Sequence, residues 1–294
     1  MASAFEEIIK RHARPLEPRP TGVSPALSVQ EGVRAVLFDV YGTLLISGSG
    51  DVGLHAAEDR SAAFAATCRA VWEEEIDGVA GVAAFKEAIT REHAAAKARG
   101  VDSPEIDVRE IWRAVKSSVP LPVVSGVDDR LNAEAAVEYE MRTNPTWEMP
   151  HAAGVLRDLR SRGLLLGIVS NAQFFTPHLF PPLLGDSLDG FGFAPGVRSW
   201  SYEHRRAKPG TFLYEHAADR LKEHGIAPGE VLYVGNDLLN DCTPAQTVGF
   251  RTALFAGDAR SLRMRGGDDR VKDTVPTVTV TDLRQIVDCL PARG

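Results

Sequence analysis

The chain has 294 residues, of which 44% are hydrophobic and 25% are charged, and its formal net charge is -7. This composition is typical of a globular protein and excludes a largely disordered one. The acidic balance argues against nucleic acid as a partner, and no apolar run approaches the roughly 18 residues needed to cross a bilayer. The three cysteines are widely spaced, as expected of a reducing cytoplasm. We therefore expect a cytoplasmic monomer or homodimer that acts on a small molecule, with neither nucleic acid nor membrane as a partner.

The first 32 residues are predicted to be an N-terminal extension. A short helix is expected over 5–12, and the prolines that follow it resist regular structure. The next segment, 33–38, is a nearly continuous apolar run, which predicts a buried parallel strand. Asp39 comes directly after this run.

Residues 48–145 are predicted to be a helical cap domain. This region is rich in alanine and has apolar residues at helical spacing, with helices expected around Phe64 to Trp72 and over 82–99, 107–118 and 128–142. The run 47–50 and the pair Asn144-Pro145 are typical of hinges. The aromatic residues of this region are expected to form the core of a helical bundle rather than a substrate pocket.

Strands and helices alternate from Pro150 to the C-terminus. Helices are predicted over 152–162 and 209–224, with a last helix capped by Thr281. Strands are predicted over 164–169, 231–234, 250–255 and 277–280. The alternation indicates an α/β fold with a Rossmann-like parallel sheet and helices on both faces. We assign this core domain to 33–47 and 146–294.

Four polar clusters follow predicted strands or precede a helix in the core domain. They are Asp39, the pair Ser170-Asn171, Lys208, and the acidic group around Asp237 and Asp241. Because the carboxyl ends of parallel strands meet at one edge of a sheet, we expect these side chains to surround one pocket.

The four clusters resemble, in order and context, the motifs of the haloacid dehalogenase-like (HAD) superfamily. The matching segments are FDVYGTLL at 38–45, IVSN at 168–171, AKPG at 207–210 and VGNDLLND at 234–241. The resemblance covers 33 to about 256, with a cap inserted after the first motif as in subfamily I. It implies that Asp39 is the nucleophile and that Lys208 holds it and balances its charge. It also implies that Gly42, Thr43, Ser170 and Asn171 bind the substrate.

A carboxylate that attacks a phosphate forms a covalent intermediate and divides one difficult displacement into two easier steps. Because nucleophile and substrate are both anionic, the reaction needs cations. The resemblance therefore implies Mg2+ held by oxygen ligands. The expected ligands are Asp39, the backbone carbonyl of Tyr41, Asn236, Asp237 and Asp241.

Two positions depart from the phosphatase pattern. Tyr41 stands where the family's phosphatases usually have an aspartate that protonates the leaving group, and Asn236 stands where they more often have aspartate. We keep Tyr41 in the candidate catalytic set with Asp39 and Lys208, although an unperturbed pKa near ~10 makes a phenol a poor donor. A phosphatase without the usual acid should prefer leaving groups of low pKa or borrow a donor from the cap.

Three functions are compatible with these residues. The leading hypothesis is a Mg2+-dependent phosphatase that acts on a small phosphorylated metabolite, because clustered acids need a cation. The pattern DxYGT also occurs in the family's 2-haloacid dehalogenases, which need no metal, so this activity is the first alternative. The second is a degenerate HAD fold that binds a ligand or partner without turnover. For Asp237 the simpler alternative is a helix N-cap, and for Asp241 a solvated helix charge.

Overall fold

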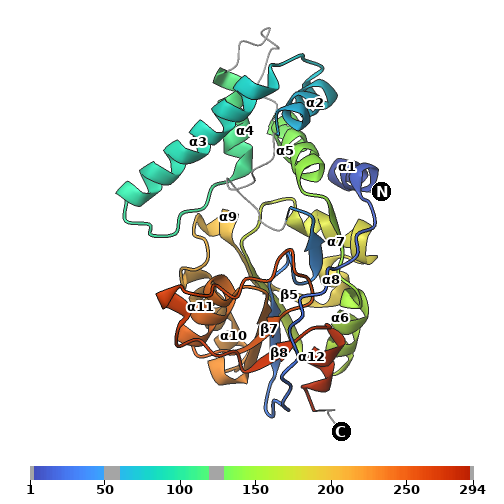
Figure 1. Ribbon diagram of the computed structural model, residues 1–294, viewed down its shortest axis with the longest axis vertical. Coiled ribbons are helices and arrows are strands. Elements are labelled where there is room, and N and C mark those ends of the chain that lie inside the picture. The colour runs from blue at the N-terminus through green and yellow to red at the C-terminus, as the bar shows by residue number, and fades with distance from the viewer. Residues whose placement is uncertain (1–2, 50–59, 119–128, 292–294) are drawn as a thin grey trace.

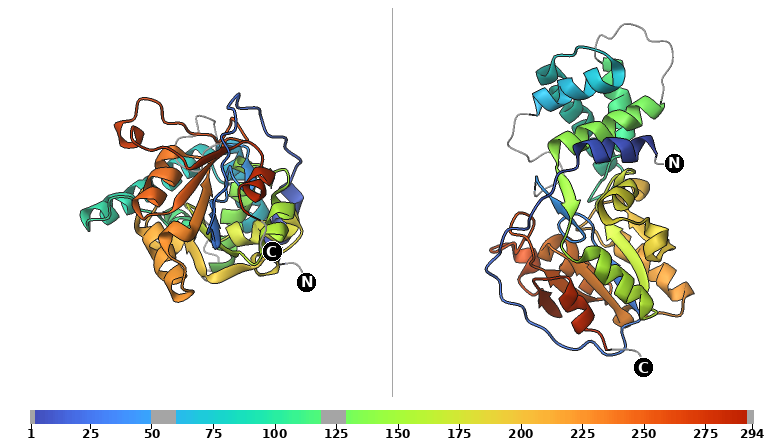
Figure 2. Two further views of the ribbon diagram at one scale, coloured as in Figure 1. Left: turned by 90° about the horizontal axis from the view of Figure 1, so that it is seen from below. Right: turned by 90° about the vertical axis from the view of Figure 1, so that its right-hand side faces the viewer.

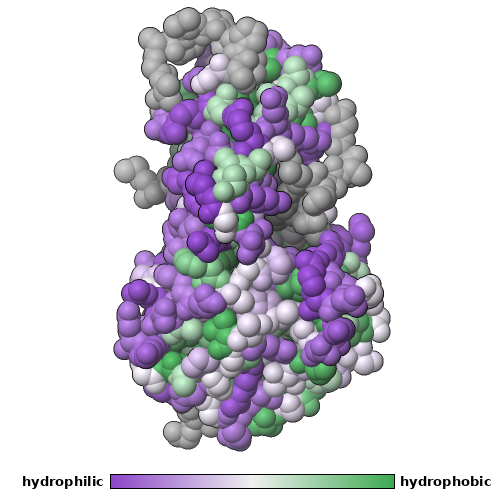
Figure 3. All heavy atoms as spheres, turned by 90° about the vertical axis from the view of Figure 1, so that its left-hand side faces the viewer, coloured by the Kyte–Doolittle hydropathy of each residue, from purple (hydrophilic) through white to green (hydrophobic). Residues whose placement is uncertain are grey.

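The computed structural model describes residues 3–49, 60–118 and 129–291 of the chain. These residues form an α/β lobe and a helical lobe above it, joined by two connections (Figure 1). Among the described helices, none is long and apolar enough to span a membrane. On the face drawn in Figure 3, hydrophobic residues are scattered among hydrophilic ones over both lobes, as is usual for protein surfaces.

The α/β lobe contains a six-stranded sheet with the order β5-β4-β1-β6-β7-β8. All neighbouring strands in this sheet are parallel. The strands are β1 (Ala35–Phe38), β4 (Leu165–Ser170), β5 (Phe193–Trp200), β6 (Val231–Gly235), β7 (Arg251–Phe255) and β8 (Val278–Val280). The chain runs outward from β1 through β4 to β5, and then returns to place β6 on the other side of β1. The strand order therefore reverses at β1, where ligands bind in open α/β sheets.

Helices cover both faces of this sheet because successive side chains of each strand point to opposite faces. Val36 and Phe38 belong to the hydrophobic cluster that includes α6 (Ala152–Ser161), α7 (Thr176–Leu184) and α12 (Arg284–Asp288). Ala35 and Leu37 pack in a second cluster. That cluster includes α10 (Phe212–Glu223) and α11 (Thr243–Thr247). The predicted α/β fold with helices on both faces is thus confirmed.

Several short elements complete the α/β lobe. They are α8 (Leu188–Phe191), α9 (Ser201–His204), the 3-10 helices η1 (Pro228–Glu230) and η3 (Asp269–Val271), and the π-helix η2 (Leu238–Cys242). The antiparallel pair β2 (Leu45–Ser47) and β3 (Thr146–Glu148) lies at the two connections to the helical lobe.

The helical lobe consists of α2 (Ser61–Trp72), α3 (Gly78–Ala98), α4 (Val108–Ser118) and α5 (Asp129–Thr143). The ring of Trp112 stacks on Phe64 with centroids 5.0 Å apart, and it also contacts Trp72, Phe85 and Tyr139. These aromatic residues form the core of the bundle, as predicted.

The N-terminal extension packs against both the helical lobe and the α/β lobe. Helix α1 (Ala4–His12) packs against α5 of the helical lobe and α7 of the α/β lobe (Figures 1 and 2). His12 contacts the buried carboxylate of Glu138 at 2.8 Å. Further along, Ala26 pairs with Thr279 beside β8, so the extension runs along the edge of the sheet.

Three of the differences from the sequence predictions have a clear physical reason or concern an element boundary. Strand β5 was not expected, because Pro195 and Gly196 interrupt its apolar pattern; proline is tolerated here because β5 is an edge strand. The helix expected from Pro209 begins at Phe212. The last helix begins at Arg284, where the side chain of Asp282, and not that of Thr281, accepts the backbone N–H.

Candidate active site

A cavity of about 110 Å³ opens at the carboxyl edge of the sheet, where β1, β4 and β6 end. It is much smaller than the roughly 300–1,000 Å³ of pockets that hold drug-sized ligands, so it suits a small anionic group. The structure brings most of the expected site residues to this cavity. Its lining residues are Asp39, Tyr41, Ser47, Asn171, Lys208, Asn236, Asp237, Asn240, Asp241, Ser261, Arg263 and Arg265.

Asp39 lies at the end of the central strand and is held through one of its two carboxylate oxygens. The hydroxyl of Ser170, at the end of β4, donates to Asp39 Oδ1 at 2.8 Å. The ammonium group of Lys208 donates to the same oxygen at 2.8 Å. Asp39 is only 7% exposed, so these contacts orient the carboxylate in a mostly dry environment. The predicted meeting of 39, 170 and 208 is present in the structure.

Lys208 lies between two carboxylates. Besides Asp39, its Nζ atom contacts Asp241 Oδ1 at 2.6 Å. Burial by itself would lower the pKa of Lys208, but the negative charges of Asp241 and Asp39 outweigh burial and raise this pKa above its ordinary value. Burial also raises the pKa of Asp241 to about 6, against the opposing effect of Lys208. Lys208 is therefore a cation at neutral pH, and Asp241 is an anion.

The carboxylate of Asp241 is fully engaged by the protein itself. Its Oδ2 atom accepts the backbone N–H groups of Asn236 at 2.9 Å and Asp237 at 3.0 Å. Its Oδ1 atom contacts the Tyr233 hydroxyl at 2.9 Å as well as Lys208. With 1% exposure, Asp241 is a buried ion-pair partner that shapes the turn after β6, and the alternative of a solvated charge is wrong.

The carboxylate of Asp237 faces a different cation. Its Oδ1 atom accepts the N–H groups of Leu239 and Asn240, so Asp237 is the N-cap of η2, as the simpler alternative supposed. Arg265 also binds it with both arms of its guanidinium group: Nε lies 3.0 Å from Oδ1, and Nη2 lies 2.5 Å from Oδ2. Asp237 and Asp241 therefore do not share one cation.

The expected oxygen ligands do not form an open cage for Mg2+. This ion needs a nearly octahedral set of oxygen atoms at about 2.0–2.1 Å. Asp237 and Asp241 are occupied as described, and the amide of Asn236 is held by Thr43 at 3.4 Å and by the carbonyl of Ser261 at 2.6 Å. Among the described residues, no group of three His, Cys, Asp or Glu side chains is placed to hold a metal ion. The three side-chain ligands expected at 236, 237 and 241 are thus engaged by other groups of the protein, and their present arrangement does not fit a ready-made Mg2+ site.

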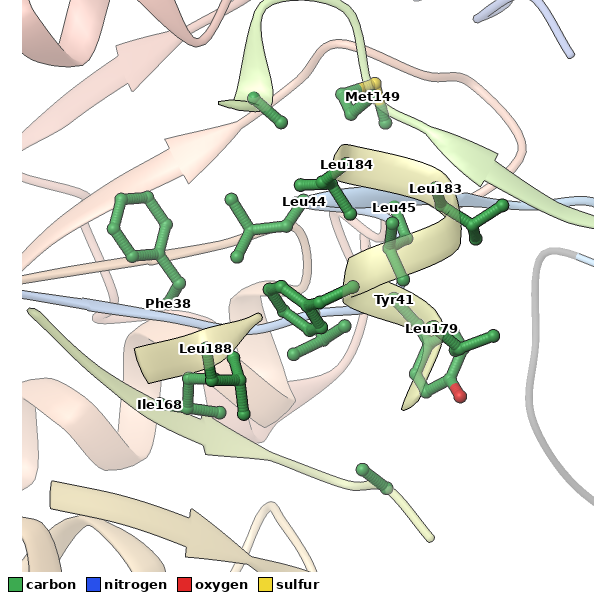
Figure 4. Packing of buried hydrophobic residues seen from close by; sticks show 14 of the residues in the cluster. Phe38, Tyr41, Leu44, Leu45, Met149, Ile168, Leu179, Leu183, Leu184 and Leu188 are labelled. Carbon is green, nitrogen blue, oxygen red and sulfur yellow. The ribbon is translucent and has the colours of Figure 1, made fainter. Parts of the chain in front are cut away.

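The hydroxyl group of Tyr41, which the sequence analysis kept in the candidate catalytic set, contacts a neighbouring helix rather than another residue of the acidic cluster. Its hydroxyl contacts Thr176 on α7 at 3.1 Å. The ring packs with Leu45 and Leu179 in the hydrophobic cluster (Figure 4). Burial raises the pKa of Tyr41 well above its ordinary value, with a smaller contribution from Glu140. A raised pKa makes this phenol a weaker proton donor than an unperturbed tyrosine.

The remaining expected residues shape the cavity in different ways. Gly42 has a left-handed φ of 81°, and a Cβ atom there would lie 2.5 Å from Ser261 Cβ, so its role is a tight turn. Thr43 is fully buried beside Asn236. The side-chain amide of Asn171 bonds to the backbone N–H and carbonyl of Lys208, and so positions that lysine.

Several lining residues were missed from the sequence. Ser261, Arg263 and Arg265 come from the loop after β7, and Arg263 is fixed beside the turn after β6 because its backbone N–H and carbonyl bond to Asn236 and Leu238. A signal was present, because this loop follows a predicted strand that ends at the same sheet edge and carries arginines at 260, 263 and 265. The sequence alone did not show which of them faces the cavity.

Comparison with known proteins identifies the family of this chain. Residues 33–249 match the family model described as haloacid dehalogenase-like hydrolase. Among curated relatives, the phosphoglycolate phosphatase of Escherichia coli (strain K12) is 29% identical over 224 residues, which are 74% of this chain and 79% of that protein. The phosphoglycolate phosphatase of Salmonella choleraesuis (strain SC-B67) is 29% identical over 225 residues, with the same coverage.

Solved structures share the fold but do not distinguish between the two enzyme classes. A HAD phosphatase from Thermococcus onnurineus has a TM-score of 0.52 at 19% identity, covering 87% of this chain and 97% of that one. The 2-haloacid dehalogenase from Pseudomonas syringae pv. Tomato DC3000 has a TM-score of 0.51 at 14% identity, with equal coverage. The curated relatives favour a phosphatase. On the family match over most of its length, the chain belongs to the haloacid dehalogenase-like hydrolases.

Proposed function

We propose that this hydrolase is a phosphatase that cleaves a phosphomonoester of a small metabolite, with Asp39 as the nucleophile. Two kinds of support point the same way. The curated relatives described above are phosphoglycolate phosphatases. The cavity of about 110 Å³ has room for a phosphoryl group. Phosphoglycolate is therefore the first substrate to test.

The observation that carries the proposal is the one-sided anchoring of Asp39. Ser170 and Lys208 both donate to Oδ1 at 2.8 Å. We therefore assign Oδ2 as the atom that attacks phosphorus. A carboxylate that is held by one oxygen and presents the other to a cavity is arranged as a nucleophile needs to be.

The proposed reaction has two displacements. In the first, a bond forms between Asp39 Oδ2 and phosphorus while the bond to the leaving oxygen breaks, and this oxygen takes a proton from water. In the second, a water oxygen attacks phosphorus and loses a proton to the hydroxide left by the first step, the bond to Asp39 Oδ2 breaks, and inorganic phosphate leaves. Lys208 holds the nucleophile, and its positive charge favours the approach of the phosphate. Thr43, Ser170 and Asn171 remain proposed substrate-binding residues. Asn171 lines the cavity, whereas Thr43 and Ser170 are buried behind its lining.

HAD phosphatases generally use a divalent metal, and Mg2+ was the cofactor expected from the resemblance. The mechanism above includes no metal step, because Lys208 and Arg265 already engage the acidic pair. The three cysteines are buried and free, which suits the reducing cytoplasm proposed from the sequence.

The test is phosphate release from phosphoglycolate and from an aryl phosphate by the purified protein. Asp39→Asn should abolish release, whereas Asp288→Asn, an exposed residue on α12, should leave it unchanged. In a second test, the protein is incubated with a substrate labelled in its phosphoryl group and the reaction is stopped with acid. Label should stay bound to the wild-type protein, as a covalent intermediate, and not to Asp39→Asn. Normal turnover by Asp39→Asn would end the proposal.

A metal-independent 2-haloacid dehalogenase remains the second candidate, because a halide needs no proton to leave and Tyr41 is a weak proton donor. The same protein incubated with 2-chloropropionate and EDTA decides between the two reactions. Halide release without phosphate release would establish the dehalogenase instead.

A further inference from the structure

The loop after β7 is an integral wall of the active-site cavity. Arg263 N donates to Asn236 O at 2.9 Å, and Leu238 N donates to Arg263 O at 2.9 Å, so the loop runs beside the turn after β6 as an added strand would. Ser261 O accepts the Asn236 amide at 2.6 Å. This loop lies beyond residue 249, where the family match ends. The loop therefore lies outside the part of the chain that matches the family model.

The N-terminal extension supports the same loop from behind. Asp258, which is 1% exposed, accepts Arg19 N at 3.1 Å and forms an ion pair with Arg260 at 3.0 Å. Ala259 N donates to Arg19 O at 2.9 Å. Both the extension and the loop lie outside the matched residues 33–249. The loop that carries Arg265 is thus held in place by contacts with the N-terminal extension.

Arg265 binds Asp237 in the two-pronged geometry that gives the strongest arginine–carboxylate pairs. Asp237 is 6% exposed, whereas the Arg265 side chain keeps 35% exposure at the cavity wall. A guanidinium group stays charged at every physiological pH. The pair therefore places a permanent positive charge where the sequence pattern suggested a divalent cation.

One of the two arguments for a metal was the repulsion expected among clustered acids; the other was the negative charge shared by nucleophile and substrate. In the structure, Lys208 lies within 2.8 Å of Asp39 and 2.6 Å of Asp241, and Arg265 neutralises Asp237. Each acid of the cluster has a cationic side chain of the protein as its partner. We propose that Arg265 takes the place of the divalent cation, so that this active site turns over phosphate esters without Mg2+. The proposal rests on the phosphatase activity proposed above.

The first experiment measures metal binding directly and does not depend on turnover. Mn2+, a paramagnetic substitute for Mg2+, is titrated into wild-type protein, Arg265→Ala, and Arg270→Ala, whose exposed side chain pairs with Asp268. Wild type and Arg270→Ala should show no bound Mn2+ signal at millimolar metal. Arg265→Ala should gain a site, because it frees the Asp237 carboxylate. Stoichiometric Mn2+ binding by the wild type, lost in Asp237→Asn, overturns the proposal.

The second experiment compares turnover with EDTA and with added Mg2+. The wild type should be equally active in both. Arg265→Ala should lose roughly ten- to hundredfold in kcat/KM, as expected for a lost charge-assisted interaction, and should recover part of it with Mg2+. Arg265→Lys, which keeps the charge without the fork, should lie between the two and stay indifferent to Mg2+. Wild-type activity that EDTA abolishes and Mg2+ restores overturns the proposal.

The two proposals fail in different ways. If the wild type releases no phosphate under either metal condition, the phosphatase assignment fails, while the Mn2+ titration still decides whether Arg265 excludes a cation. If the wild type is active only with Mg2+, the phosphatase assignment stands and the role of Arg265 is rejected.

Discussion

Lys208 Nζ lies 2.8 Å from Asp39 Oδ1, although 169 residues separate them in the chain. The same ammonium group contacts Asp241, and all three side chains are less than 10% exposed. Removing two carboxylates and a cation from water is costly, so the arrangement holds only because each charge has a partner at hydrogen-bond distance.

Replacing Lys208 by methionine should therefore impair both activity and folding. Phosphate release should fall roughly a hundred- to thousandfold, because the nucleophile loses its anchoring cation. The free energy of unfolding should fall by about 3–5 kcal/mol, because two buried carboxylates lose their partner. Steady-state kinetics and urea unfolding measure the two effects. The double variant Lys208→Met/Asp241→Asn should regain part of the lost stability but no activity, because Asp39 still lacks its cation. Near-normal turnover by Lys208→Met would contradict the assigned role.

Tyr41→Phe should leave kcat unchanged, because the Tyr41 hydroxyl contacts Thr176 in the hydrophobic cluster. Loss of this hydrogen bond should lower the free energy of unfolding by about 1 kcal/mol. Thr176→Val, which removes the other partner, is the matched control and should give a similar loss. A large drop in kcat with Tyr41→Phe, absent in Thr176→Val, would restore Tyr41 as a proton donor.

The rate should depend strongly on the acidity of the leaving group. With Tyr41 in place of the usual acid, the departing oxygen carries developing negative charge that water must neutralise. In a series of aryl phosphates, kcat/KM should rise steeply as the pKa of the leaving phenol falls, and alkyl phosphates should be slow. A flat series under single-turnover conditions would mean that another residue of the site donates the proton.

Asp258→Asn should weaken the wall that presents Arg265. The carboxylate of Asp258 bonds to Arg19 N and to the Arg260 side chain, and a neutral amide cannot satisfy both. We expect a loss of roughly 1–3 kcal/mol in the free energy of unfolding and a lower kcat/KM. Faster amide hydrogen exchange over 258–265 is the direct measurement. Asp268→Asn, which removes the similar but more exposed pair with Arg270, should leave stability, kcat/KM and hydrogen exchange over 258–265 unchanged. Unaltered exchange in Asp258→Asn would show that Asp258 does not support this loop.

Most core strands could be predicted from the sequence because their signal is local. A buried parallel strand is a continuous apolar run, and β1, β4 and β6 begin and end within two residues of the expected positions. Strand β5 was not predicted, because its apolar pattern is interrupted by a proline and a glycine that an edge strand tolerates. The meeting of Asp39, Ser170 and Lys208 was also predictable, because strand ends converge at one edge of a parallel sheet.

The partners of the acidic residues were decided by tertiary structure. Asp237 and Asp241 look equivalent in the sequence, four residues apart, yet one binds Arg265 and the other binds Lys208. Which cation each carboxylate meets depends on the path of the loop after β7, and hydrogen bonds to a distant turn set that path. The Tyr41 hydroxyl likewise turns toward α7 because the hydrophobic cluster accommodates its ring there. Sequence determined the strands and the order of polar groups through local patterns, whereas the pairing of charges required contacts between segments that only the folded chain brings together.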